Sequence, residues 1–232
     1  MNYVFIPGAW HGGWSWTPVA HRVRAAGHLA YTLTMPGLTL GDSPRDLRLA
    51  DATDHLIHEI ESRDLTDVVL VGHSWAGFPI TAAAPRLTAR LREIVFFSAF
   101  VPLRGQSMLA AFGPEAEAFY LSVIEADPDH GIGLDYETFR GTLMPDGPDE
   151  AARIVFEQLI PQPGGYMSEA LDVDGVATLG VPVRYLLAEN DTGLAAPGPE
   201  LAARAGVEPI MVPGGHEALL THPDEIAKAL LG

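Results

Sequence analysis

A serine in a glycine-flanked turn is the residue of this chain best placed to act as a nucleophile. Ser74 stands in the segment Gly72-His73-Ser74-Trp75-Ala76-Gly77, directly after the apolar run Val68–Val71. We interpret the segment as the Gly-x-Ser-x-Gly elbow pattern, with the second glycine displaced by one residue to Gly77. A helix-capable stretch, 78–87, follows at once. Strand, tight turn and helix would hold the hydroxyl exposed on a strained turn, and the two glycines would leave room at the strand–helix crossing.

A serine hydroxyl is a weak nucleophile and needs a base and an acid that orients the base. His216 follows the strand-like run Glu208–Val212 through a Gly-Gly turn, so we predict that it is the base. The acid should follow the run Val183–Leu187, where we predict Asp191 and keep Glu189 as the alternative. Serine, acid and histidine then occur in the expected order. Activity should fall as His216 becomes protonated, at a pH near the ordinary histidine pKa of about 6.5.

Acyl chemistry also needs N–H donors for the oxyanion that develops on the substrate. We predict the backbone N–H of Trp75, which follows the serine, and that of Ala9 in the loop after the first strand. Gly8 would let the backbone of this loop approach closely. A plain strand–helix turn is the alternative for the loop. His11 and His73 are expected to support the loop and the elbow through hydrogen bonds.

Aromatic residues next to these loops could form an apolar substrate pocket. We predict that Trp10, Trp75 and Phe100 line it, with packing in the core as the alternative. For Phe112, Phe119 and Tyr120 we make no choice between lining the pocket and packing in the core.

Strand-like and helical runs alternate along most of the chain, which predicts an α/β fold. The strand-like runs are Asn2–Ile6, Leu29–Leu33, Asp67–Val71, Glu93–Phe97, Val183–Leu187 and Glu208–Val212. The helical runs between them are 14–26, 50–63, 78–87, 199–205 and 224–231. Such a pattern indicates a mostly parallel six-stranded sheet with helices on both faces.

The alternation stops over residues 103 to about 175, which we interpret as a small helical cap inserted over the carboxyl ends of the strands. Helical patches occur at 107–112, 115–125 and 150–159, and no clear strand is predicted there. Residues 1–232 are predicted to form a single domain that includes this cap.

The composition of the chain excludes or disfavours several classes of function. The chain of 232 residues has a net charge of −16, which disfavours nucleic acid and anionic membranes as partners. It contains no cysteine, so disulfides and thiol nucleophiles are excluded. No leader peptide or membrane-length apolar run is visible, and we expect a cytoplasmic protein. A homodimer is compatible with these numbers.

The opening Ile6-Pro7-Gly8-Ala9-Trp10-His11-Gly12-Gly13-Trp14-Ser15-Trp16 resembles that of the small α/β-hydrolases related to plant methylesterases and hydroxynitrile lyases. Gly-His-Ser-Trp-Ala-Gly, Ala-Phe-Val-Pro at 99–102, Asn-Asp at 190–191 and Gly-Gly-His at 214–216 follow in matching order. The resemblance covers nearly the whole chain. It implies the α/β-hydrolase fold and a serine hydrolase that uses Ser74, Asp191 and His216, with no metal and no cofactor.

Three positions differ from the residues that the resembled proteins carry, and two of these differences indicate which reaction to expect. Pro7 stands where many of these proteins have histidine, which affects hydrogen bonding in the loop. The lyases resembled here carry lysine after the catalytic histidine and threonine in the first loop, whereas this chain has Glu217 and Gly8. Both changes favour hydrolysis of a small, largely apolar carboxylic ester through an acyl-enzyme.

Two alternatives remain. One is a tailoring enzyme on the same triad: a lactonase, thioesterase, C–C hydrolase or cyclase. The other is a non-catalytic small-molecule receptor. Epoxide hydrolases and dehalogenases of the usual type are disfavoured, since they have aspartate at the position of Ser74.

Overall fold

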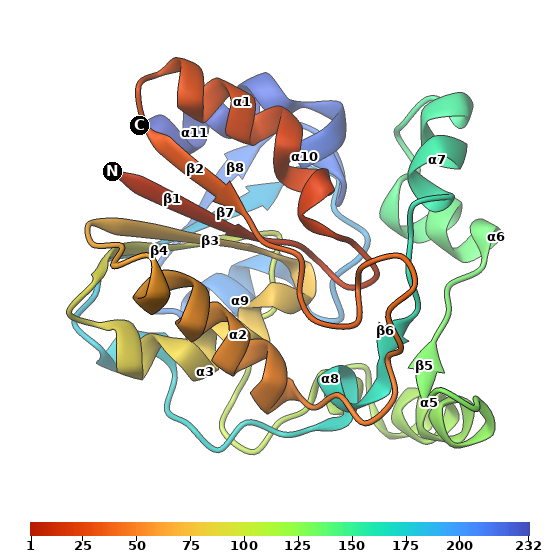
Figure 1. Cartoon of the computed structure of the whole chain (residues 1–232). Helices are drawn as coiled ribbons and strands as arrows, with labels where there is room; N and C mark the ends of the chain where they lie inside the picture. Colours follow the sequence, from red (N-terminus) through yellow and green to blue (C-terminus); the bar gives the residue numbers. More distant parts are fainter.

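Six parallel strands form the centre of the molecule, in the order β2-β1-β3-β4-β7-β8 (Figure 1). The computed structural model describes residues 1–232. The strands are β1 (Asn2–Ile6), β2 (Leu29–Thr32), β3 (Val68–His73), β4 (Leu91–Phe97), β7 (Val183–Ala188) and β8 (Pro209–Val212). Every neighbouring pair in this sheet is parallel. The α/β fold and the six-stranded parallel sheet predicted from the alternation are confirmed, and the strand boundaries differ by at most two residues from those predicted.

Helices cover both faces of the sheet (Figure 1). On one face lie α1 (Thr17–Ala25), α10 (Ala218–Thr221) and α11 (Pro223–Leu231), and on the other α2 (Leu49–Ser62), α3 (Gly77–Leu87) and α9 (Gly198–Arg204). Strand side chains alternate between the two layers: Tyr3 and Phe5 pack with α1 and α11, while Val4 and Ile6 pack with α2 and α3. Because both faces of the sheet are covered, the buried parts of the central strands are mainly apolar on both faces.

The segment 98–182, between β4 and β7, is called the cap segment from here on. Its helices are α4 (Met108–Ala111), α5 (Pro114–Ala126), α6 (Tyr136–Thr138), α7 (Asp149–Phe156) and α8 (Gly164–Ser168), with one π-helical turn at Phe139–Leu143. The three predicted helical patches correspond to α4, α5 and α7.

The prediction that this segment contains no strand was wrong. Two short strands, β5 (Gly131–Ile132) and β6 (Gln162–Pro163), form an antiparallel pair that we call the cap ribbon. Strands of two residues cannot display a periodic pattern, and only the folded chain brings these two together. That residues 1–232 form a single domain stays a prediction.

None of the helices combines the length and the apolar character that a membrane span requires.

Candidate active site

Ser74 occupies a strained turn at the end of β3. Its φ of +53° lies in the left-handed region, which non-glycine residues rarely adopt. The backbone N–H of Ser74 donates to the carbonyl of Ser98 at 3.2 Å, and the N–H of Phe100 donates to the carbonyl of Ser74 at 3.0 Å. These bonds to the chain after β4 hold the turn in place.

The two glycines of the turn are required by close contacts. A Cβ at Gly77 would lie 1.7 Å from the carbonyl oxygen of Phe100, and one at Gly72 would lie 2.3 Å from an isoleucine methyl group on α3. The predicted steric role of both positions is confirmed. The obstacle at Gly77, however, is the chain that follows β4 and not the strand–helix crossing itself.

The three residues predicted to form a triad are hydrogen-bonded in series. The Nε2 atom of His216 lies 3.0 Å from Oγ of Ser74, and its Nδ1 atom lies 2.9 and 3.0 Å from the two carboxylate oxygens of Asp191. A carboxylate only accepts hydrogen bonds, so Nδ1 carries the proton and Nε2 presents its lone pair to the serine hydroxyl. Asp191 also accepts the N–H of Gly193 at 2.8 Å.

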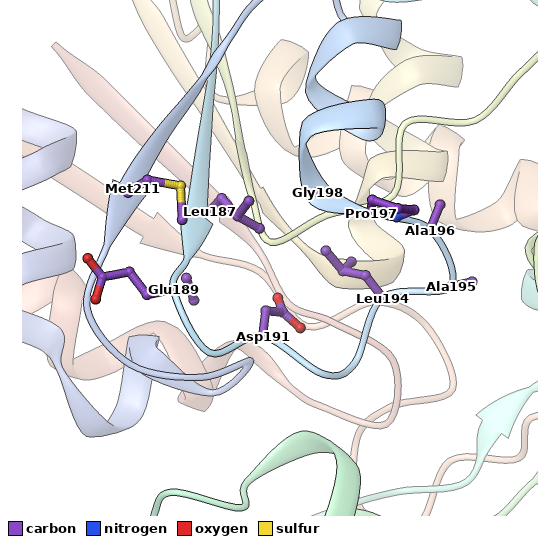
Figure 2. Close-up of a pocket in the computed structure, with 10 residues that line it drawn as sticks. Leu187, Glu189, Asp191, Leu194, Ala195, Ala196, Pro197, Gly198 and Met211 are labelled. Atoms are coloured by element: carbon purple, nitrogen blue, oxygen red, sulfur yellow. The ribbon is translucent and has the colours of Figure 1, made fainter.

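Gly193 allows this arrangement, because a Cβ there would lie 2.7 Å from the imidazole ring of His216. The alternative acid, Glu189, is exposed and makes no contact with the histidine. Figure 2 shows the Glu189 side chain directed away from Asp191. The geometry therefore selects Asp191 as the partner of His216.

Charges around the histidine compete with its burial. Burial disfavours the imidazolium of His216, but the charge and the hydrogen bond of Asp191, together with the charge of Glu217, outweigh it and raise the pKa of His216. Burial likewise opposes ionisation of Asp191, yet His216 and further hydrogen bonds hold the pKa of this carboxyl below its usual value. The pair is arranged to stabilise a carboxylate beside an imidazolium.

The loop after β1 lies directly against the elbow. A Cβ at Gly8 would lie 2.9 Å from the His73 ring and 3.1 Å from Cβ of Ser74, which confirms the close approach predicted for this glycine. Ala9 is 3% exposed, and its N–H makes no hydrogen bond within the protein. An unpaired buried N–H beside a candidate nucleophile is suited to an oxyanion. The backbone of Trp75, the second predicted donor, directly follows Ser74 in a 3₁₀ turn.

Trp10 joins this loop to the cap ribbon, a feature that the sequence pattern did not reveal. Its backbone N–H donates to Oε1 of Gln162 at 2.8 Å, and its indole N–H donates to the carbonyl of Ile132 at 2.8 Å. Its carbonyl accepts the N–H of Ile160 at 3.0 Å. Trp10 also has a φ of +65°. The residue next to the proposed oxyanion donor is thus held by three hydrogen bonds from the cap segment.

The other aromatic residues proposed to line a pocket are deeply buried. The side chain of Trp75 is fully buried, stacks on Tyr166 with ring centroids 5.1 Å apart, and donates its indole N–H to the carbonyl of Tyr166 at 3.0 Å. Phe100 is 2% exposed and packs against Phe78 and Phe112. The Trp75 side chain serves as a core contact between the 3₁₀ turn after β3 and the cap segment. Lining by Trp10 and Phe100 stays a prediction.

A surface cavity of about 370 Å³ lies behind the acid and not over the serine. Its walls come from the ends of β7 and β8, the loop after β7 and the start of α9, and include Leu187, Glu189, Asp191, Leu194 and Met211 (Figure 2). Ser74 and His216 are not among the lining residues. Ser74 itself is 6% exposed, so the cap segment and neighbouring loops leave little of the hydroxyl open.

The cap segment also contacts the loops that carry the acid and the histidine. Asp146 accepts the N–H of Gly215 at 2.8 Å, and the carbonyl of Thr142 accepts the hydroxyl of Thr192 at 2.7 Å. All three loops of the candidate site are therefore bonded to the same segment.

His73, His216 and Glu217 form a cluster of potential metal ligands. Both ring nitrogens of His216 are already engaged by Ser74 and Asp191, and Nε2 of His73 lies 3.0 Å from the carbonyl of His216. The cluster does not offer three free donor atoms, so it does not fit a metal centre.

Residues 3–229 match the alpha/beta hydrolase family. The chain is 30% identical over 248 residues to a carbendazim hydrolyzing esterase of Nocardioides sp. (strain SG-4G), covering 99% of this chain and 98% of that protein. It is 35% identical over 109 residues to salicylic acid-binding protein 2 of Nicotiana tabacum, covering 44% of this chain and 40% of that protein.

Among solved structures, an extracellular alpha/beta-hydrolase from a Paenibacillus species superposes with a TM-score of 0.93 at 27% identity, covering 100% of this chain and 98% of that one. That protein is described as sharing structural and functional homology with the tobacco protein. The resemblance inferred from the motifs is confirmed. The cytoplasmic location stays a prediction.

Proposed function

This chain belongs to the alpha/beta hydrolase family and is a carboxylic ester hydrolase, and we propose that it cleaves esters of small, largely apolar molecules through an acyl-enzyme on Ser74. The observation that carries the proposal is the series of hydrogen bonds from Asp191 through His216 to Ser74. This arrangement supplies the base and the oriented acid that a serine nucleophile needs.

In the first half of the reaction, Oγ of Ser74 attacks the ester carbonyl carbon and its proton passes to Nε2 of His216. The N–H groups of Ala9 and Trp75 hold the oxyanion of the tetrahedral intermediate. When the intermediate collapses, the bond to the alkoxy group breaks. The imidazolium returns its proton to the leaving oxygen, so that an alcohol departs and the acyl group remains on the serine.

Water completes the cycle. It attacks the acyl carbon as His216 takes its proton. When the second tetrahedral intermediate collapses, the bond between the acyl carbon and Oγ of Ser74 breaks, the imidazolium returns the proton to Oγ, and the carboxylic acid departs. Asp191 stabilises the imidazolium in both halves. The raised pKa of His216 supports this assignment, because it reflects a site that favours the charged ring.

The proposed partner is a small-molecule ester, and the net charge of −16 argues against nucleic acid or an anionic membrane in that role. The aromatic residues around the elbow, the partly buried Trp10 and the buried Phe100 among them, support an apolar acyl or alcohol group.

The decisive experiment compares hydrolysis of short-chain p-nitrophenyl esters by the wild type and by Ser74→Ala. The variant should lose about 10⁴- to 10⁶-fold in kcat. Ser122→Ala, which alters an exposed serine on α5, is the matched control and should keep the wild-type rate. A fluorophosphonate should add to the wild type and to the control but not to Ser74→Ala. Equal turnover by Ser74→Ala and the wild type would remove Ser74 from the mechanism.

A further inference from the structure

Glu217, the residue after the histidine of the triad, is a buried acid without a hydrogen bond. Its side chain is 1% exposed, and neither carboxylate oxygen has a hydrogen-bond partner in the protein. A buried carboxylate is costly unless it is paired, so the residue that faces it is informative. That residue is His11, whose Nε2 atom lies 3.6 Å from Oε1 of Glu217.

The tautomer of His11 follows from its other ring nitrogen. Nδ1 lies 2.7 Å from the carbonyl oxygen of Ala9, and a carbonyl only accepts, so Nδ1 carries a proton. Nε2 is fully buried and has no other polar partner than Glu217. An attractive contact between this nitrogen and a carboxylate requires one proton between them, on either atom.

His11 and Glu217 each adjoin a group that is proposed to act in the reaction. His11 is bonded to the carbonyl of Ala9, whose N–H is the proposed oxyanion donor, and Glu217 directly follows the proposed base, His216. The third buried histidine, His73, places its Nε2 atom 3.0 Å from the carbonyl of His216, and one of its ring nitrogens lies within 4.8 Å of a carboxylate oxygen of Glu217 without a hydrogen bond to it. The contact between His11 and Glu217 therefore joins the loop after β1 to the loop after β8.

We propose that His11 and Glu217 form a buried pair that shares one proton and positions the Ala9 N–H relative to His216, so that both residues are positioning residues for ester hydrolysis. The inference rests on the function proposed above. It explains why an acid is tolerated at the almost fully buried position 217: the carboxylate faces a histidine with one ring nitrogen left unpaired.

The first test compares three substitutions in steady-state hydrolysis of p-nitrophenyl acetate. Glu217→Leu leaves His11 without a partner, and kcat should fall about 10- to 100-fold because the oxyanion donor is misplaced. KM should change by less than about threefold, since the loss is confined to the transition state. Glu217→Gln can still donate an amide hydrogen to Nε2, so it should keep kcat within about threefold of the wild type. Glu225→Leu, an exposed acid on α11, is the control and should match the wild type.

The pH profile separates a pair that shares a proton from an unpaired carboxylate at Glu217. The charged or titratable groups that face His216 and its loop are Asp191, Glu217, His11, His73, Asp146 and His222. With its shared proton the pair of His11 and Glu217 carries no net charge, and neither does His11 beside the amide of Glu217→Gln, so this variant should keep both the acid limb and the plateau rate of the wild type. An acid limb that moves to lower pH in Glu217→Gln, as loss of an unpaired carboxylate would cause, or a kcat no higher than that of Glu217→Leu, would overturn the proposal.

Two further measurements keep the proposal testable if Glu217→Leu does not fold. In the ¹⁵N-histidine-labelled wild type, both ring nitrogens of His11 should show the shifts of protonated or hydrogen-bonded atoms. A free lone pair at Nε2 would contradict the shared proton. A double-mutant cycle of His11→Phe and Glu217→Met, two changes that keep side-chain bulk and remove the polar atoms, should give non-additive losses in the denaturation midpoint, because both changes remove the same contact; additive losses would refute the pair. These two readouts do not depend on activity, whereas failure of fluorophosphonate labelling in the wild type would overturn the proposed function alone.

Discussion

The imidazole Nε2 of His216 lies 3.0 Å from the hydroxyl oxygen of Ser74, although 142 residues separate the two in the chain. Both residues follow strands of one parallel sheet, and the carboxyl ends of parallel strands share an edge. Asp191 fixes the opposite side of the ring, so the remaining lone pair faces the serine. This relationship leads to predictions about the acid, the pH dependence, the turn and the cap segment.

Asp191→Asn should lower kcat by about 10⁴-fold, because an amide cannot hold the required tautomer of His216 or stabilise its charged form. Steady-state hydrolysis of p-nitrophenyl esters measures the effect. Glu189→Gln alters the neighbouring exposed acid and should change kcat by less than about twofold. The reverse result, with activity lost in Glu189→Gln and kept in Asp191→Asn, would make Glu189 the acid.

The acid limb of kcat/KM should lie above the ordinary histidine value of about 6.5, and not near it as the sequence alone suggested. The base works only when Nε2 is unprotonated, and its surroundings raise the pKa of His216. Activity is therefore lost as pH falls through this raised pKa, and removal of the Asp191 charge should move the limb downward. A profile measured with a neutral ester, over a pH range where circular dichroism is constant, tests this. A limb below about 6.5 would show that burial outweighs the charge of Asp191 at His216, and a flat profile through this range would exclude His216 as the base.

Gly77→Ala should destabilise the fold by about 1–3 kcal/mol or more, since the new Cβ would meet the Phe100 carbonyl oxygen at 1.7 Å. The midpoint of urea unfolding, at unchanged slope, measures the change. Gly133→Ala is the matched control, because a Cβ at that glycine meets nothing within 4 Å. Equal midpoints for the two variants would show that the turn can relax around the extra carbon.

Gln162→Leu should reduce both stability and turnover. It leaves the backbone N–H of Trp10 without its acceptor, which costs about 1–3 kcal/mol for a buried donor. It also loosens the loop that carries Ala9, so kcat should fall roughly 10-fold or more. Urea unfolding and ester turnover are measured side by side, with the exposed Gln158→Leu as control. Wild-type kcat in a destabilised Gln162→Leu would show that the cap ribbon supports the fold without positioning the loop.

The three residues of the candidate triad could be predicted from short sequence patterns. A strand that runs into a glycine-flanked serine, and an Asp and a His that each follow a later strand, identify Ser74, Asp191 and His216 because residue type and position after a strand are local properties. The close approach of Gly8 was predictable for the same reason. The competition between Asp191 and Glu189 was not, since both lie in one loop and only its folded path decides which carboxylate meets the ring.

The sequence by itself determined the alternation of strands and helices, the parallel sheet and the residue types gathered at its carboxyl edge, because these depend on periodicity and order along the chain. Only the tertiary structure decided that Trp10 donates hydrogen bonds to Gln162 and Ile132. It also decided that Glu217 faces His11. These contacts join segments far apart in sequence, and the cap strands that supply two of them are two residues long. Their energy comes from pairing buried polar groups, a requirement that exists only once the chain has folded and excluded water.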